Sequence, residues 1–300
     1  MPPSSSNDAL AQIPAPAGES RTSRKMGDGA QWPGRSGSLE ATCAGAIVGG
    51  AATLGAAAWL LHDPTDVSSS TLRFALGAGA AWAFTALTLL RHRGQGQVLR
   101  SAPDAAHAAI ATRAALSGNA ETLSAATWIT LFRALLIAFA AGHIFLAPLA
   151  TGARAVAVGI AYSVAAVLDN VDGRVARRQG RTTALGARLD VATDALGLVV
   201  APLIAIRAGR LPPYYLLLSC AFPLKQALLA LRTLRGRPVF WHRIGPNPRA
   251  RFFAGVQMLV VATALFPVLP TRLLWAAGTI AMLPTLALFT QEWWRATTPG

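Results

Sequence analysis

The feature that most constrains the fold of this chain is a series of apolar blocks, each long enough to cross a membrane. Eight blocks are predicted, at residues 41–61, 73–91, 127–149, 153–170, 185–206, 212–231, 251–269 and 272–290. A transmembrane helix needs about 20 predominantly apolar residues, and a backbone within lipid must satisfy its own hydrogen bonds. We therefore predict an all-α fold, a polytopic transmembrane helix bundle.

Charged residues are scarce and mostly basic. They make up 13% of the chain, against about 25% in soluble domains. The net charge of +14 raises the alternative of nucleic-acid binding. The basic residues, however, fall between the apolar blocks and not on one polar domain, so we expect a lipid bilayer as partner and no nucleic acid.

The distribution of apolar and polar residues predicts five regions. The first region, residues 1–40, is rich in Ser, Pro and Gly and lacks an apolar core, which is typical of a disordered tail. The third region, residues 92–123, contains a stretch at 103–117 that is predicted to form an amphipathic helix on the membrane surface. The regions are a disordered tail (1–40), an accessory two-helix membrane segment (41–91), a cytoplasmic linker (92–123), a six-helix core (124–293) and a C-terminal tail (294–300).

The arginines between the blocks predict the orientation. If the N-terminus is cytoplasmic, most of these arginines fall on the cytoplasmic side, as the positive-inside rule requires. We therefore expect a multi-pass protein of the cell membrane whose two ends, and the connection between the blocks at 153–170 and 185–206, face the cytoplasm.

Acidic residues are concentrated in one place. Four carboxylates are the only ones between residues 122 and 291, and all lie within 26 residues: Asp169, Asp172, Asp190 and Asp194. The first two are three residues apart at the end of one block, and the last two are four residues apart at the start of the next. On helices, each of these spacings places both side chains on one face. A short turn between antiparallel helices then predicts that the four carboxylates converge.

Four converging carboxylates need positive charge nearby, because each aspartate within a membrane costs about 2.5–3.5 kcal/mol. Arginines can supply that charge, but a site built only from oxygen ligands suits Mg²⁺ or Mn²⁺. One or two such ions can clamp a pyrophosphate. Intramembrane aspartates also mark ion pathways, so a cation transporter is an alternative.

The segment 169–194 resembles the signature of the CDP-alcohol phosphotransferases, D-x2-D-G-x2-A-R-x8-G-x3-D-x3-D. The matching positions are Asp169, Asp172, Gly173, Ala176, Arg177, Gly186, Asp190 and Asp194. The resemblance extends over about residues 121–290. It implies a phospholipid-synthesis enzyme that transfers a phosphatidyl group from CDP-diacylglycerol to a small alcohol and releases CMP.

The resemblance also implies roles for the carboxylates. Asp169, Asp172 and Asp190 would ligate Mg²⁺ or Mn²⁺, with two ions expected. Asp194 would complete the metal site and act as the catalytic base toward the acceptor hydroxyl. A homodimer is expected as well.

The remaining signature residues are expected to bind the donor. Gly173 and Ala176 would leave room for the cytidine diphosphate, and Arg177 would contact its phosphates. The absence of bulky side chains agrees with close approach of a backbone to a nucleotide. For Gly186, close helix packing is an equal alternative.

A weaker resemblance precedes the signature. Family members often begin their first core helix with Asn-x-x-Thr-x-x-Arg, and here Thr127, Thr130 and Arg133 have that spacing, with Thr127 in place of Asn. Thr130 and Arg133 are predicted to line the substrate site. An arginine that extends to the membrane interface is the alternative for Arg133.

Two basic features follow the signature. Arg249 and Arg251 are predicted to bind a phosphorylated acceptor of the glycerol 3-phosphate or inositol 1-phosphate type, since arginine suits bidentate phosphate contact. A plain cytoplasmic basic loop is the alternative. Lys225 lies within an apolar block, where it would neutralise the carboxylates, reach a lipid phosphate or mark a helix boundary.

Two further alternatives concern the whole chain. Some relatives transfer a CDP-amino alcohol onto diacylglycerol instead of using CDP-diacylglycerol. A catalytically silent scaffold would keep the fold without the chemistry, although the intact signature argues against it.

Overall fold

The computed structural model describes residues 36–60, 67–92, 123–146, 152–179, 184–240 and 247–298. These residues form eight α-helices and one short 3-10 helix, with no strand among them. The predictions for most of the N-terminal tail and for the amphipathic helix at 103–117 lie outside the described residues.

The described elements confirm the predicted all-α bundle, with a six-helix core preceded by two apolar helices. Their bounds are α1 Ser36–Leu60, α2 Val67–His92, α4 Ala125–Ala141, α5 Ala153–Gln179, α6 Ala184–Arg207, η3 Pro213–Tyr215, α7 Leu216–Leu234, α8 Pro248–Leu265 and α9 Thr271–Thr297. Six helices are long and apolar enough to cross a membrane, and α4 is a shorter apolar helix. The chain is therefore a multi-pass membrane protein.

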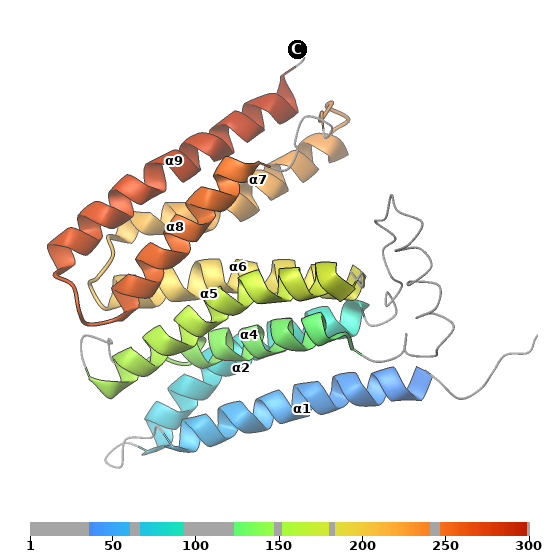
Figure 1. Ribbon diagram of the computed structural model, residues 1–300, viewed down its shortest axis with the longest axis vertical. Coiled ribbons are helices and arrows are strands. Elements are labelled where there is room, and N and C mark those ends of the chain that lie inside the picture. The colour runs from blue at the N-terminus through green and yellow to red at the C-terminus, as the bar shows by residue number, and fades with distance from the viewer. Residues whose placement is uncertain are drawn as a thin grey trace, which may run out of the picture. The chain divides into compact units, whose positions relative to one another are not determined.

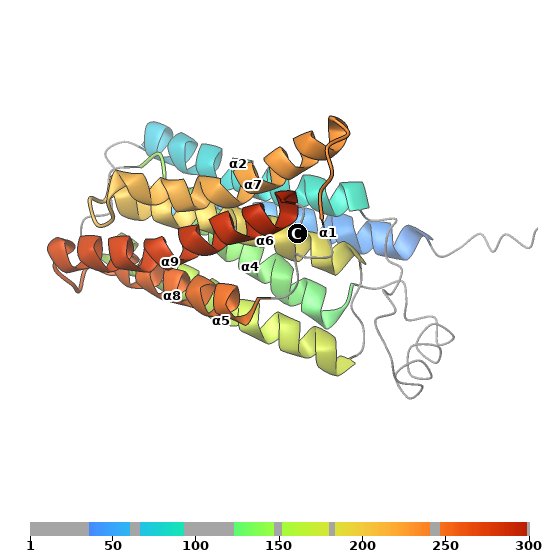
Figure 2. The same cartoon turned by 90° about the horizontal axis from the view of Figure 1, so that it is seen from above.

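Helices α4, α5 and α6 form the middle of the bundle formed by residues 35–300 (Figure 1). Helix α4 packs against both α5 and α6. The pair α1 and α2 covers one side of these helices, and α7, α8 and α9 lie on the other side. Figure 2 shows from above that the helices run roughly along one direction.

The two N-terminal helices pack tightly on the core. A Cβ atom at Gly77 of α2 would lie 2.2 Å from the carbonyl oxygen of Ala141 on α4, so only glycine allows this approach. Trp82 of α2 donates a hydrogen bond of 3.0 Å from Nε1 to the carbonyl oxygen of Ile47 on α1. These contacts join α1 to α2 and α2 to α4.

Helix boundaries explain how the acidic segments come together. Helix α5 continues to Gln179, beyond the predicted apolar block, so Asp169 and Asp172 both lie inside a helix. Helix α6 begins at Ala184 and runs in the opposite direction to α5, with both helices packed on α4 (Figure 1). The end of α5 and the starts of α4 and α6 therefore lie at the same end of the bundle, at the right in Figure 1.

Other helices also differ from the predicted blocks, and α1 already begins at Ser36, inside the region predicted as a disordered tail (1–40). Helix α4 stops at Ala141, and α9 runs to Thr297, into the predicted C-terminal tail. Polar side chains such as those of Gln291 and Glu292 continue α9 without ending it. Hydropathy marks where a chain is apolar, whereas backbone hydrogen bonding decides where a helix ends.

Candidate metal and substrate site

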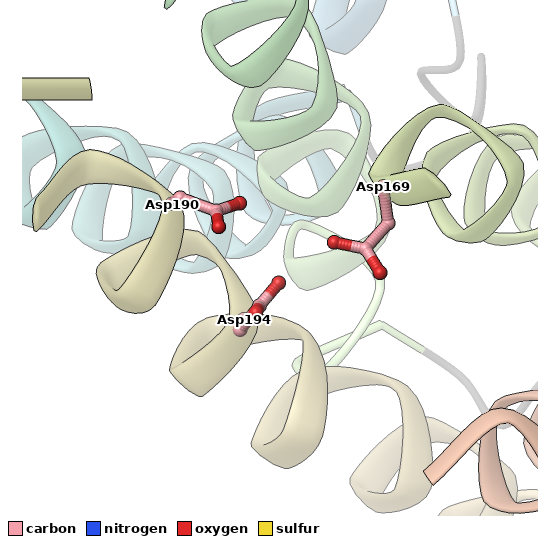
Figure 3. Close-up of side chains that lie close together, drawn as sticks. All are labelled: Asp169, Asp190 and Asp194. Atoms are coloured by element: carbon pink, nitrogen blue, oxygen red, sulfur yellow. The ribbon is translucent and has the colours of Figure 1, made fainter. Parts of the chain in front are cut away.

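Three carboxylates converge between α5 and α6. Asp169 projects from α5, and Asp190 and Asp194 project from adjacent turns of α6 toward it (Figure 3). One oxygen from each lies within 4.8 Å of the others. The spacing of four residues between Asp190 and Asp194 places them on one face of α6, which is why a single helix contributes two of the three groups.

The guanidinium of Arg133, from α4, contacts all four aspartates. Its Nη1 lies 2.7 Å from Asp172 Oδ2 and from Asp190 Oδ1. Its Nη2 lies 2.7 Å from Asp169 Oδ1 and from Asp194 Oδ1. Arg133 is 2% exposed, so the structure places it among the carboxylates and not at the bundle surface.

Asp172 is the most buried of the four aspartates, with a side chain that is 7% exposed. Thr130 Oγ1 lies 3.2 Å from Asp172 Oδ2 and 3.0 Å from the carbonyl oxygen of Ala126. Thr130 therefore contacts the carboxylate group, and its predicted role in substrate binding stays a prediction. Thr127 instead contacts Ser124, whose hydroxyl accepts a hydrogen bond from the Thr127 backbone N–H and caps α4.

The donor chemistry of the site fits a divalent metal. Carboxylate oxygens are the preferred ligands of Mg²⁺ and Mn²⁺. Asp169, Asp190 and Asp194 each offer such an oxygen within one small region. That group of three does not include Asp172, whose predicted role as a ligand stays a prediction.

A cavity of about 420 Å³ has Asp194 in its lining and is walled by residues of α4, α5 and α6 and of α7, α8 and α9. Arg133 and Asp194 line it at one end, and Pro202, Tyr215 and Leu218 line it farther along. The cavity follows α6 from Asp194 to Pro202, which is about 12 Å of helix. Most of its walls are apolar, and its charged lining residues come from both sides, with Arg133 and Asp194 on one side and Lys225, Arg251 and Glu292 on the other.

Three charged side chains face this cavity from the helices opposite the carboxylates: Lys225, Arg251 and Glu292. Lys225 of α7 forms an ion pair with Glu292 of α9, with Nζ 2.5 Å from Oε2. Arg251 lies in the first turn of α8 and is exposed. Arg249 is also exposed, but it is not among the described residues that line the cavity.

Glu292 is a cavity-lining residue that we did not predict. It is the only acidic residue after Asp194, and Lys225 is the only lysine after residue 25. That isolation of one acid and one lysine in apolar surroundings is the signal that indicates a pair. The pairing answers the open question of what Lys225 contacts.

The other signature residues are only partly described. Helix α5 runs through Gly173, Ala176 and Arg177, but the predictions for these three side chains lie outside the described part. Gly186 lies in the first turn of α6 and is partly buried.

Fold and site together define a class: a multi-pass helical membrane protein with a carboxylate centre at one end of the bundle. The sequence model of CDP-alcohol phosphatidyltransferases matches residues 123–289, more than half of the chain. The chain belongs to the CDP-alcohol phosphatidyltransferase family. Membership implies a phosphotransferase with a CDP-alcohol donor and an alcohol acceptor. No curated protein and no solved structure matches the chain.

Proposed function

We propose that this protein transfers the phosphatidyl group of CDP-diacylglycerol to a small phosphorylated alcohol and releases CMP, a step of phospholipid synthesis. The acceptor is of the glycerol 3-phosphate or inositol 1-phosphate type. The observation that carries the proposal is the position of Asp194, which belongs to the group of converging carboxylates and also lines the cavity. A proton acceptor is thereby combined with a place for a substrate.

The carboxylates hold the metal. Asp169, Asp190 and Asp194 provide converging oxygens, and Asp172 joins them to hold two ions of Mg²⁺ or Mn²⁺. When bound, such ions neutralise charge on a diphosphate and on its leaving group. Gly173, Ala176 and Arg177 bind the cytidine diphosphate, as the family signature implies.

The apolar length of the cavity suits the lipid part of the donor. Its walls between α6 and α7 include Leu198, Leu218 and Phe222, which match the chemistry of an acyl chain. A donor with its diphosphate at the carboxylates therefore keeps an acyl chain in apolar surroundings.

The transfer itself requires one proton acceptor and one nucleophile. Asp194 takes the proton of the acceptor hydroxyl, and the resulting oxygen attacks the β-phosphorus of CDP-diacylglycerol. A bond forms between that oxygen and the β-phosphorus, while the bond to the oxygen shared with the α-phosphate breaks. CMP leaves with the bonding electron pair.

Arg251 supports a phosphorylated acceptor. It lines the cavity from the helix opposite Asp194, and in the described part of the chain it forms no salt bridge with a carboxylate. Its planar guanidinium suits bidentate phosphate binding. Arg249 lies two residues before Arg251 and is exposed. It adds positive charge near the side of the cavity that Arg251 lines.

The proposal includes location and assembly. The arginine-rich ends of the helices near the site favour a cytoplasmic active site in the cell membrane. A homodimer is part of the proposal, and crosslinking in native membranes tests it.

Purified protein with labelled CDP-diacylglycerol, Mg²⁺ and a panel of acceptors tests the reaction. The panel contains glycerol 3-phosphate, inositol 1-phosphate, serine and no acceptor, and CMP release is measured. We expect CMP release with a phosphorylated acceptor only. Release with serine alone would overturn the acceptor class, and turnover of a CDP-amino alcohol with diacylglycerol would overturn the donor. Cation flux into liposomes without nucleotide would indicate a transporter.

A further inference from the structure

The contacts of Arg133 exceed what a single positioning arginine needs. Each of its two terminal nitrogens lies 2.7 Å from two different carboxylates. In the described part of the chain, the salt bridges of these four carboxylates all go to Arg133. Its side chain is 3% exposed, and its Nε is buried with no hydrogen-bond partner among the described residues. The guanidinium is thus fixed by the four acids.

The charges at this centre do not balance. Four ionised carboxylates carry four negative charges, and the one guanidinium carries one positive charge. Oxygens of three of these carboxylates lie within 4.8 Å of one another, and the repulsion between like charges is stronger where water is scarce. Arg133 therefore stabilises the centre, yet it leaves enough negative charge to attract further cations.

A metal ion and Arg133 bind the same group of carboxylates. Nη1 and Nη2 occupy one oxygen of each carboxylate at 2.7 Å, whereas Mg²⁺ holds its ligands at about 2.1 Å. A cation that close to these oxygens also repels the guanidinium. Metal binding and the Arg133 contacts are therefore competitive.

We propose that Arg133 is an exchangeable counter-ion. It holds the four carboxylates before metal binds, and it gives up these contacts when the ions bind. Asp172 contacts Arg133 and Thr130 and is not in the group of three, and it then becomes available as a ligand.

After metal binds, the guanidinium of Arg133 can bind the phosphates of the donor. Arg133 lines the cavity next to Asp194, where, on the proposed function, the donor diphosphate lies. Two parallel N–H groups suit a phosphate as well as a carboxylate. Arg133 thus exchanges protein carboxylates for the phosphates of the donor.

The alternative role is a fixed positioning residue that holds the carboxylates in the geometry that the metal needs. The two roles predict opposite changes in metal affinity when Arg133 is replaced. Loss of a competing cation tightens metal binding, whereas loss of a residue that orients ligands weakens it by about 10–100-fold.

The test measures Mn²⁺ binding by titration calorimetry and thermal unfolding of the full chain in detergent, with no turnover required. Without metal, Arg133→Met should unfold at a lower temperature than the wild type. Added Mn²⁺ should raise the unfolding temperature of Arg133→Met by more than it raises that of the wild type. The Mn²⁺ affinity of Arg133→Met should rise by about 5-fold or more, within the usual range of coupling between sites. At saturating Mn²⁺, it should bind CDP-diacylglycerol more weakly than the wild type.

Two variants accompany it. Arg133→Lys keeps the positive charge, so its Mn²⁺ affinity should be closer to that of the wild type. If Arg133→Met folds only with metal, Arg133→Lys is compared with the wild type in its place, and the rate of Mn²⁺ release to a chelator replaces the titration. Arg210→Met is the matched control, because Arg210 contacts the carbonyl oxygens of Phe266 and Leu269 and not the carboxylates. Its Mn²⁺ affinity should be unchanged.

The outcomes separate this proposal from the proposed function. Equal or weaker Mn²⁺ binding by Arg133→Met, with normal binding by the wild type, overturns the counter-ion role alone. Unchanged donor binding by Arg133→Met overturns the exchange onto phosphate. A wild-type protein that binds no Mn²⁺ overturns the metal site and the proposed function together.

Discussion

The ion pair between Lys225 and Glu292 joins α7 to α9 at the wall of the cavity, and its removal tests that arrangement. Lys225 Nζ lies 2.5 Å from Glu292 Oε2, and the two side chains are 11% and 17% exposed. The ammonium also lies 4.8 Å from the ring centroid of Phe289 and 5.7 Å from that of Phe222. We expect single substitutions to destabilise the bundle more than a double substitution does.

The expected magnitudes follow from burial. Loss of one partner of a buried pair costs about 3–5 kcal/mol, because the other charge stays uncompensated. Both side chains keep some exposure, so Glu292→Gln should cost about 2–3 kcal/mol, below that range. Lys225→Met also loses the ring contacts, worth about 0.5–1 kcal/mol each, and should cost about 3–4 kcal/mol. The double variant leaves no buried charge but loses the same ring contacts, and it should cost about 1–2 kcal/mol.

The assay is reversible denaturant unfolding of the wild type, both single variants and the double variant in detergent micelles. A coupling energy of about 3 kcal/mol is expected from the cycle, at the upper end of the range for residues in contact. Single effects that add to the double effect within about 0.5 kcal/mol would refute the pair. Single variants as stable as the wild type would do the same.

Three other predictions follow from the site and the packing. Asp172→Asn should weaken Mn²⁺ binding by about 10–100-fold, measured by calorimetry; unchanged affinity would exclude a ligand role. Ala176→Leu should abolish binding of CDP-diacylglycerol while the thermal unfolding temperature stays near that of the wild type; unchanged donor affinity would place the nucleotide elsewhere. Gly77→Ala should destabilise the bundle by about 1–3 kcal/mol, because its Cβ would meet a backbone oxygen. Gly79→Ala, where a Cβ meets nothing within 4 Å, is the control and should cost nothing.

The sequence predicted the acidic part of the site because helical spacing determines which side chains share a face. Asp190 and Asp194, four residues apart, lie on one face of α6 as expected. The short connection between α5 and α6 also predicted their approach to Asp169. These contacts involve residues of one helix or of two consecutive helices, and their geometry follows from helical spacing and from the length of the connection.

Contacts between distant helices were not predictable in the same way. The sequence allowed Arg133 either to line the site or to reach the interface, and only the packing of α4 against α5 and α6 decides between them. The pairing of Lys225 with Glu292 is a contact between residues 67 positions apart. Neither hydropathy nor spacing specifies which faces of α7 and α9 meet.

The central claim is that the carboxylate centre performs the transfer, with Asp194 as the base. Asp194→Asn removes the proton acceptor but keeps the size of the side chain. CMP release from CDP-diacylglycerol with saturating acceptor and Mn²⁺, measured beside donor binding by calorimetry, tests this claim most directly. The account predicts nearly normal donor binding and turnover reduced by about 10²–10⁴-fold. Turnover at the wild-type rate would contradict it.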